Sequence, residues 1–192
     1  MNKTLTEAQI FELATSHGYN YKALKAIIQI ESGQHGFSPV TGKLIIQFEP
    51  AWFKRLKKDW QNDTKHVIWQ SNTVGDQTAE WKAFNNAFAS DADAAMKSTS
   101  IGMMQLMGFH YAALGFNTVG QMWDFAKADE YNQVLLAIKW IKTVPALDKA
   151  LKAKNWQKVA YYYNGENYRQ YRYDSRLAAA YNTMDEFKKV NI

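Results

Sequence analysis

Two glutamates, Glu31 and Glu49, have the setting that most favours chemistry in this chain. Glu31 lies on the same face of a predicted helix as Ile27 and Ile28, four and three positions earlier. It also ends that helix, where the backbone carbonyls oppose a negative charge. Both effects favour a raised carboxyl pKa, which a general acid working near neutral pH requires. The alternative is a Glu31 side chain that escapes into solvent at a frayed helix end.

Glu49 follows eighteen residues later, at the end of a predicted β-hairpin. The turn signal is Thr41–Gly42, and the run Leu44–Phe48 is rich in β-branched and aromatic residues. A hairpin that folds back would place the two carboxylates on opposite walls of a groove, as hydrolysis of a glycosidic bond requires. The alternative for Glu49 is a strand-end charge paired with Arg55 or Lys43.

The hydrophobic spacing predicts a mainly α, α+β chain that forms a single domain over residues 1–192, with one small β-hairpin and a groove between hairpin and helices. The first helix is expected to start at a capping box over Thr4–Glu7 and to end at His17. Further helices are predicted at about 20–30, after Pro50, at 79–89, from Asp91 to Lys97, and at 101–114, 118–128, 130–143, 155–163 and 173–189. The segment 58–78 is expected to be an irregular loop.

Three blocks in a fixed order resemble the N-acetylmuramidase family of phage endolysins. The first joins Glu31–Phe37 to Phe48–Phe53, and the second is Ser100–Phe109, which reads Ser-x-Gly-x-x-Gln-Leu-Met-Gly-Phe. The third is Tyr163–Gly165. The second block is also similar to a helix of goose-type lysozymes and lytic transglycosylases. The resemblance implies a lysozyme-like fold and a peptidoglycan substrate.

The resemblance also implies roles for individual residues. Glu31 matches the catalytic acid, and Glu49 matches the second carboxylate that assists it. The positions that match substrate-binding residues are Gln105, Tyr163, Asn164 and Gly165. From the residues alone, the Gln105 amide inside an apolar helix needs either the groove or a neighbouring backbone group as its partner. Asn164 and Gly165 could equally form a simple loop turn.

We therefore expect a glycoside hydrolase that cleaves between N-acetylmuramic acid and N-acetylglucosamine and lyses bacterial cells. One alternative is a lytic transglycosylase, in which one glutamate acts as acid and base and leaves a 1,6-anhydro product. Another is a wall-binding module of the same fold without activity.

The composition excludes several other chemistries. The absence of cysteine rules out disulfides, zinc–thiolate sites and a cysteine nucleophile. The four histidines lack metal-ligand spacing, so neither a metal nor another cofactor is expected. Ser32 does not stand in a nucleophile-elbow motif, and there is no phosphate-binding glycine loop.

The charge is concentrated at one end. Residues 149–192 carry nine basic and four acidic side chains, which accounts for the whole net charge of +5. A basic end favours a polyanionic partner such as the bacterial envelope, whereas nucleic-acid binding is not expected. We expect a monomer. The start of the chain lacks the apolar stretch of a signal peptide, so synthesis in a host cytoplasm and action on the wall after release are expected.

Overall fold

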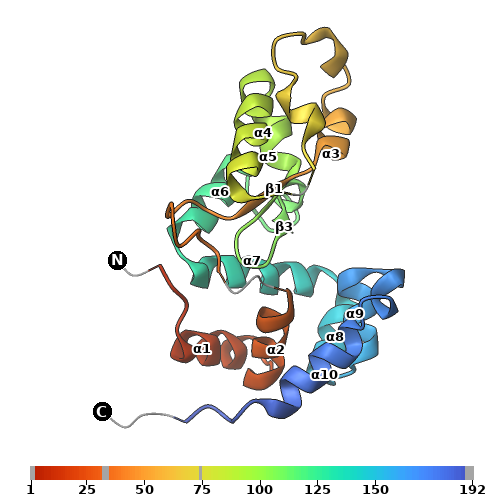
Figure 1. Ribbon diagram of the computed structural model, residues 1–192. Helices are drawn as coiled ribbons and strands as arrows, with labels where there is room; N and C mark the ends of the chain where they lie inside the picture. The colour runs from red at the N-terminus through yellow and green to blue at the C-terminus, as the bar shows by residue number, and fades with distance from the viewer. Residues whose placement is uncertain (1–2, 32–34, 74, 189–192) are drawn as a thin grey trace.

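The computed structural model describes residues 3–31, 35–73 and 75–188, and it arranges them as two lobes on either side of one helix, α7 (Glu130–Thr143) (Figure 1). The first lobe contains α1 (Glu7–His17), α2 (Tyr21–Glu31), α8 (Pro145–Lys152), α9 (Trp156–Asn164) and α10 (Tyr173–Thr183). The second contains α3 (Pro50–Leu56), α4 (Gln77–Ser90), α5 (Ala92–Lys97), α6 (Val119–Ala128) and a small sheet. Short 3₁₀ helices connect these elements: η1 (Trp60–Asn62), η2 (Ile68–Ser71), η3 (Gly108–His110) and η4 (Glu166–Arg169).

Polar caps set the ends of many helices. Thr6 and Gln9 form a reciprocal capping box at the start of α1, so the box predicted over Thr4–Glu7 lies two residues too early. The side chains of Asp91 and Asp129 accept backbone N–H groups at the starts of α5 and α7. These local hydrogen bonds explain why most predicted helices are found close to their expected positions.

Each lobe has its own hydrophobic core, and α7 belongs to both. Val134 and Ile138 pack in the core of the first lobe, while Leu136 packs in that of the second. Trp140 is half-buried and packs against both cores. Because apolar residues occur on more than one side of α7, the helix packs in both cores and fixes the two lobes relative to each other.

The sheet has three short antiparallel strands, β1 (Ile46–Phe48), β2 (Thr99–Ile101) and β3 (Leu106–Met107), in that order. Gln47 lies opposite Ser100 in the β1–β2 pair. Ile46 and Phe48 are buried in the core of the second lobe, so Gln47 points to the other face. One face of the sheet is therefore apolar and the opposite face carries polar side chains.

The segment predicted as an apolar helix at 101–114 is instead the β2–β3 hairpin followed by η3. Gly102 and Gln105 have positive φ angles of 70° and 48°, which an α-helix does not accept. The segment is apolar all round because it is covered on two sides. Met103 packs in the core of the first lobe, and Leu106 packs in that of the second.

Three further differences concern chain ends and pairing. The turn at Gly42 is present, and a single bridge joins Phe37 to Leu44, but β1 takes β2 as its main partner.

The last helix ends at Thr183 instead of continuing to residue 189, which lies outside the described residues. Beyond it, Phe187 stacks on Phe11 of α1 at 4.5 Å between ring centroids. The helix α8 was not predicted.

Candidate active site

The first predicted catalytic residue, Glu31, is the last residue of α2. Its backbone therefore lies at the expected helix end, and the neighbouring Ile27 and Ile28 are buried in the core of the first lobe. The Glu31 side chain, together with residues 32–34 of the first motif, lies outside the part of the chain that the structure describes. Its role as an acid stays a prediction.

Glu49 belongs to a row of polar side chains on the open face of the sheet, which also includes Gln47, Ser100 and Gln105. It precedes α3, and its backbone N–H donates to the Ser98 carbonyl at 2.9 Å. The Gln47 side chain donates from Nε2 to Glu49 Oε1 at 2.8 Å. In the described residues, the proposed ion pairs of Glu49 are not found. The Arg55 guanidinium lies over the Trp52 ring, and the Lys43 ammonium lies over the Trp81 ring.

Gln105 lies in the same row, in the tight turn between β2 and β3. Its Oε1 accepts a hydrogen bond from Ser100 Oγ at 2.9 Å, and its Nε2 donates to the Gly102 carbonyl at 2.7 Å. The Nε2 group thus has a neighbouring backbone partner, as the second of the two alternatives predicts, while Oε1 is bound by the Ser100 side chain. Because Ser100 pairs with Gln47, the sheet brings Gln105 and Glu49 to one face.

The third motif, Tyr163–Gly165, ends α9 in the first lobe. Gly165 adopts a φ of 80° and donates its N–H to the Tyr161 carbonyl at 2.9 Å, so it ends the helix as the turn interpretation predicts. The half-buried Tyr163 ring meets Trp140 of α7 edge-on, at 5.1 Å between centroids. Tyr163 and Asn164 thus share a lobe with Glu31, whereas Glu49 and Gln105 belong to the other lobe.

Two buried polar residues of α7, Glu130 and Gln133, were missed by the sequence analysis. The Glu130 carboxylate accepts the backbone N–H groups of Gly36 at 2.7 Å and of Leu5 at 2.8 Å. Gln133 Oε1 accepts the N–H of Met103 at 2.7 Å. These side chains attach the segment that follows Glu31, and the turn that carries Gln105, to the same helix. The sequence does contain a sign of this role, because two polar residues three positions apart lie on the same side of a helix and need hydrogen-bond partners where that side is buried.

The close approach of the turn to Gln133 depends on Gly102. A Cβ at Gly102 would lie 2.7 Å from the Gln133 side chain, and its φ of +70° disfavours other residues. We expect Gly102→Ala to lower the free energy of unfolding by roughly 2–4 kcal/mol, because overpacking adds to the cost of the left-handed backbone. Urea denaturation measures this loss.

Gly42 provides the matched control. Its φ is +66°, but apart from Gly42 and its two chain neighbours no atom of the described residues lies within 4 Å of the position that a Cβ would occupy. Gly42→Ala should therefore lower the free energy of unfolding by only about 1 kcal/mol, which is the cost of the left-handed backbone alone. Equal losses for the two variants would contradict the role assigned to the contact between Gly102 and Gln133.

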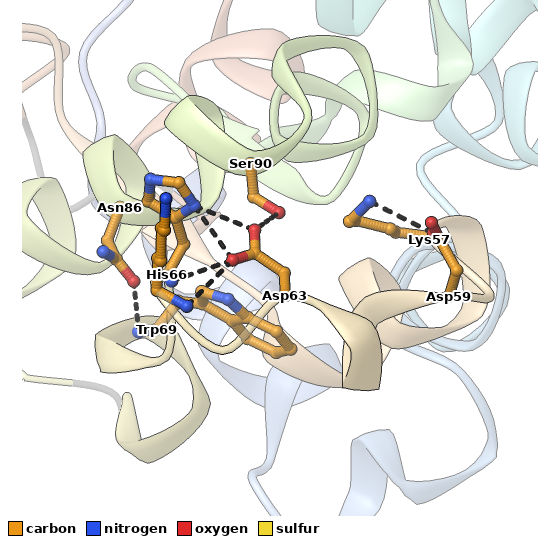
Figure 2. A network of polar contacts seen from close by, with 8 residues as sticks. Lys57, Asp59, Asp63, His66, Trp69, Asn86 and Ser90 are labelled. Carbon is orange, nitrogen blue, oxygen red and sulfur yellow. Dashed lines mark hydrogen bonds and ion pairs between the residues drawn. The ribbon is translucent and has the colours of Figure 1, made fainter.

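A second polar cluster, around Asp63, has the residue types of a serine hydrolase but not the geometry (Figure 2). Asp63 accepts a short hydrogen bond from Ser90 and lies 2.8 Å from His66 Nδ1. The hydrogen bonds from Ser90 and His66 hold the pKa of the Asp63 carboxyl well below its usual range. Because Ser90 donates to Asp63 and not to the imidazole, the histidine does not activate the hydroxyl. The cluster fastens the loop before η2 to the end of α4.

Two kinds of site were also sought in the described ranges. Among the side chains that the structure describes, which exclude that of Glu31, no group of three His, Asp or Glu residues could hold a metal ion. In the same ranges, no helix has the length and apolar character needed to cross a membrane.

Two lobes share one helix, with Glu49 next to the sheet of one lobe and the end of α2 in the other, and this is a lysozyme-like fold. The chain belongs to the N-acetylmuramidase family, which it matches over residues 20–185. It is similar to the endolysin of Burkholderia phage AP3, whose crystal structure matches with a TM-score of 0.85 and 28% sequence identity. The match covers 95% of this chain and 72% of that one. No curated protein sequence matches the chain.

Proposed function

We propose that this protein is an endolysin that hydrolyses the bond between N-acetylmuramic acid and N-acetylglucosamine in peptidoglycan, and so lyses bacterial cells. The observation that carries the proposal is the family match over residues 20–185, which includes all three sequence motifs. The likeness to a phage endolysin over 95% of the chain supports the same assignment.

In the proposed mechanism, Glu31 donates its proton to the glycosidic oxygen while positive charge develops on the muramic acid ring. Glu49 stabilises that charge or activates the attacking water. The hydrogen bond from Gln47 Nε2 holds one oxygen of the Glu49 carboxylate and leaves the other to act. The glycan would pass between the lobes, with Gln105 on one side and Tyr163, Asn164 and Gly165 on the other.

A second carboxylate on the open face of the sheet favours hydrolysis over transglycosylation. A lytic transglycosylase uses one glutamate for both proton transfers, and its product lacks the elements of one water. Glu49 lies in a hydrogen-bonded row with Gln47, and this row has no function in that alternative.

Loss of turbidity in a suspension of permeabilised bacteria tests the proposal. We expect the purified chain to clear the suspension and to release new reducing ends from isolated cell walls. A chain that binds the walls tightly but releases no reducing ends would instead be a wall-binding module, and the proposal would be wrong.

We further propose that the monomeric protein approaches anionic envelopes through its basic end, with peptidoglycan as its partner and without nucleic acid. Lys158 and Arg169 are exposed on α9 and η4. Lysis should slow as salt rises from about 10 to 150 mM, because the Debye length falls from roughly 30 to 8 Å. Replacing both residues with glutamine should flatten this dependence.

The control removes the same charge from the other lobe, through Lys58→Gln and Lys65→Gln, two exposed positions. This pair should leave the salt dependence of lysis close to that of the parent chain. Identical salt profiles for the parent and both double variants would rule out a directed approach through the basic end.

A further inference from the structure

Five rings form a continuous series of contacts from one lobe to the other. We call them the aromatic row: Trp52, Phe109, His110, Trp140 and Tyr163. The centroid separations along the row are 4.7, 4.4, 5.9 and 5.1 Å. Its members come from α3, η3, α7 and α9, elements far apart in the sequence.

The aromatic row is neither core nor open surface. All five residues are half-buried, so each keeps part of its area accessible. Trp140, near the end of α7, packs against the cores of both lobes. The row therefore crosses the junction of the lobes and does not lie on the outside of either one.

Both ends of the row lie beside residues that the proposed function uses. Trp52 is in the first turn of α3, three positions after Glu49, and its backbone N–H donates to the backbone carbonyl of Glu49 at 3.0 Å. Tyr163 precedes Asn164 at the end of α9. Phe109 follows β3, whose Met107 lies opposite Ser100, the residue whose hydroxyl donates to Gln105.

The row is chemically suited to the uncharged faces of sugar rings. Burial lowers the pKa of His110 below its ordinary value, so at neutral pH the imidazole is an uncharged ring like its neighbours. Partly exposed aromatic faces bind flat apolar surfaces, and the C–H faces of pyranoses are such surfaces. At the outer end of the row the Arg55 guanidinium stacks over Trp52, and Arg55 is itself exposed.

We propose that the aromatic row is the surface on which several consecutive N-acetylated sugars of the glycan strand lie. The inference rests on the proposed function, because it takes the glycan strand as the ligand. It adds Trp52, Phe109, His110 and Trp140 to the substrate-binding residues. A row of five rings is longer than one sugar ring, so the affinity of the protein for a glycan should rise with the number of sugars in it.

The experiment measures binding separately from cleavage. In a Glu31→Gln background, affinity for N-acetylglucosamine oligomers of two to six sugars is measured by calorimetry. We expect tighter binding with each added sugar, and we expect Trp52→Leu and Phe109→Leu to weaken binding of the longest oligomer by about three- to tenfold each. The loss should be smaller for the dimer, which cannot reach every ring.

Trp60→Leu is the matched control. Trp60 is also half-buried in the second lobe, but its ring contacts Trp69 and Lys54 outside the row. It should bind all oligomers as the parent does, with thermal unfolding confirming that each variant is folded. Equal affinities for the Trp52, Phe109 and Trp60 variants would overturn the inference, as would affinity that does not depend on length.

Failure of the two proposals can be told apart. If the unsubstituted chain releases no reducing ends from cell walls, yet the Trp52 and Phe109 variants lose affinity, the hydrolysis proposal fails and the aromatic row stands. If reducing ends are released and the affinities are unchanged, the aromatic row fails and hydrolysis stands.

Discussion

Replacing Glu31 with glutamine should abolish lysis of permeabilised cells while leaving the protein folded. The amide has nearly the same shape as the carboxylic acid but has no acidic proton to give to the leaving oxygen. General acid catalysis contributes about 10²–10⁴-fold to such reactions, and lysis slowed by that factor falls below detection in a turbidity assay. Circular dichroism and thermal unfolding would check that the fold is kept.

Glu12→Gln makes the same chemical change at an exposed position of α1. Glu12 accepts a hydrogen bond from the Tyr131 hydroxyl at 3.2 Å, which a glutamine oxygen can also accept. This variant should lyse cells at the parent rate. Near-parent lysis by a folded Glu31→Gln protein would remove the acid from the mechanism.

Glu49→Gln is expected to reduce the rate of wall hydrolysis by roughly a hundredfold, which is less than the loss at Glu31. A neutral amide stabilises a developing positive charge poorly and does not accept a proton from water. The glutamine can still accept from Gln47 Nε2 through its own oxygen, so the local geometry should persist. The loss should appear in kcat more than in KM, because the interaction is needed in the transition state.

Gln47→Met separates the charge of Glu49 from its orientation. This variant keeps the carboxylate but removes the hydrogen bond that holds it, so it should lose only a small part of the activity. An unchanged kcat in Glu49→Gln would show that the second carboxylate has no part in the reaction. The chain would then resemble a single-glutamate enzyme.

The elements that could be predicted from the sequence are those set by local signals. Pro50 begins α3 at the position where proline suits a first helical turn, and Asp91 caps α5. The apolar positions of α7 recur at helical spacing, so the sequence predicts a helix over residues 130–143. Such signals act within a few residues and need no knowledge of the rest of the fold.

The β2–β3 hairpin could not be predicted because its signals are long-range. Ser100 pairs with Gln47, which is 53 positions away, and the turn depends on space beside Gln133. An apolar segment covered by two cores looks like a buried helix when only its composition is visible. The left-handed backbone of Gln105 leaves no trace in the sequence, because glutamine is not a residue that favours it.

The candidate site was predicted in part. Glu49 and Gln105 were named from the motifs, and the sheet brings them to one face through Gln47 and Ser100. The contribution of Gln47 was not foreseen, because it depends on which face of a strand is open. Glu130 was missed because its partner is the backbone of Gly36, 94 positions away.

Mass analysis of the fragments released from purified peptidoglycan tests the central claim most directly. The account predicts fragments that end in a reducing N-acetylmuramic acid, which borohydride converts to the alcohol, and that are absent after treatment with Glu31→Gln. Fragments lighter by one water, which end in 1,6-anhydromuramic acid and resist borohydride, would identify a lytic transglycosylase. Fragments with N-acetylglucosamine at the reducing end would place the cleavage at the other bond, and either result would contradict the proposed hydrolysis.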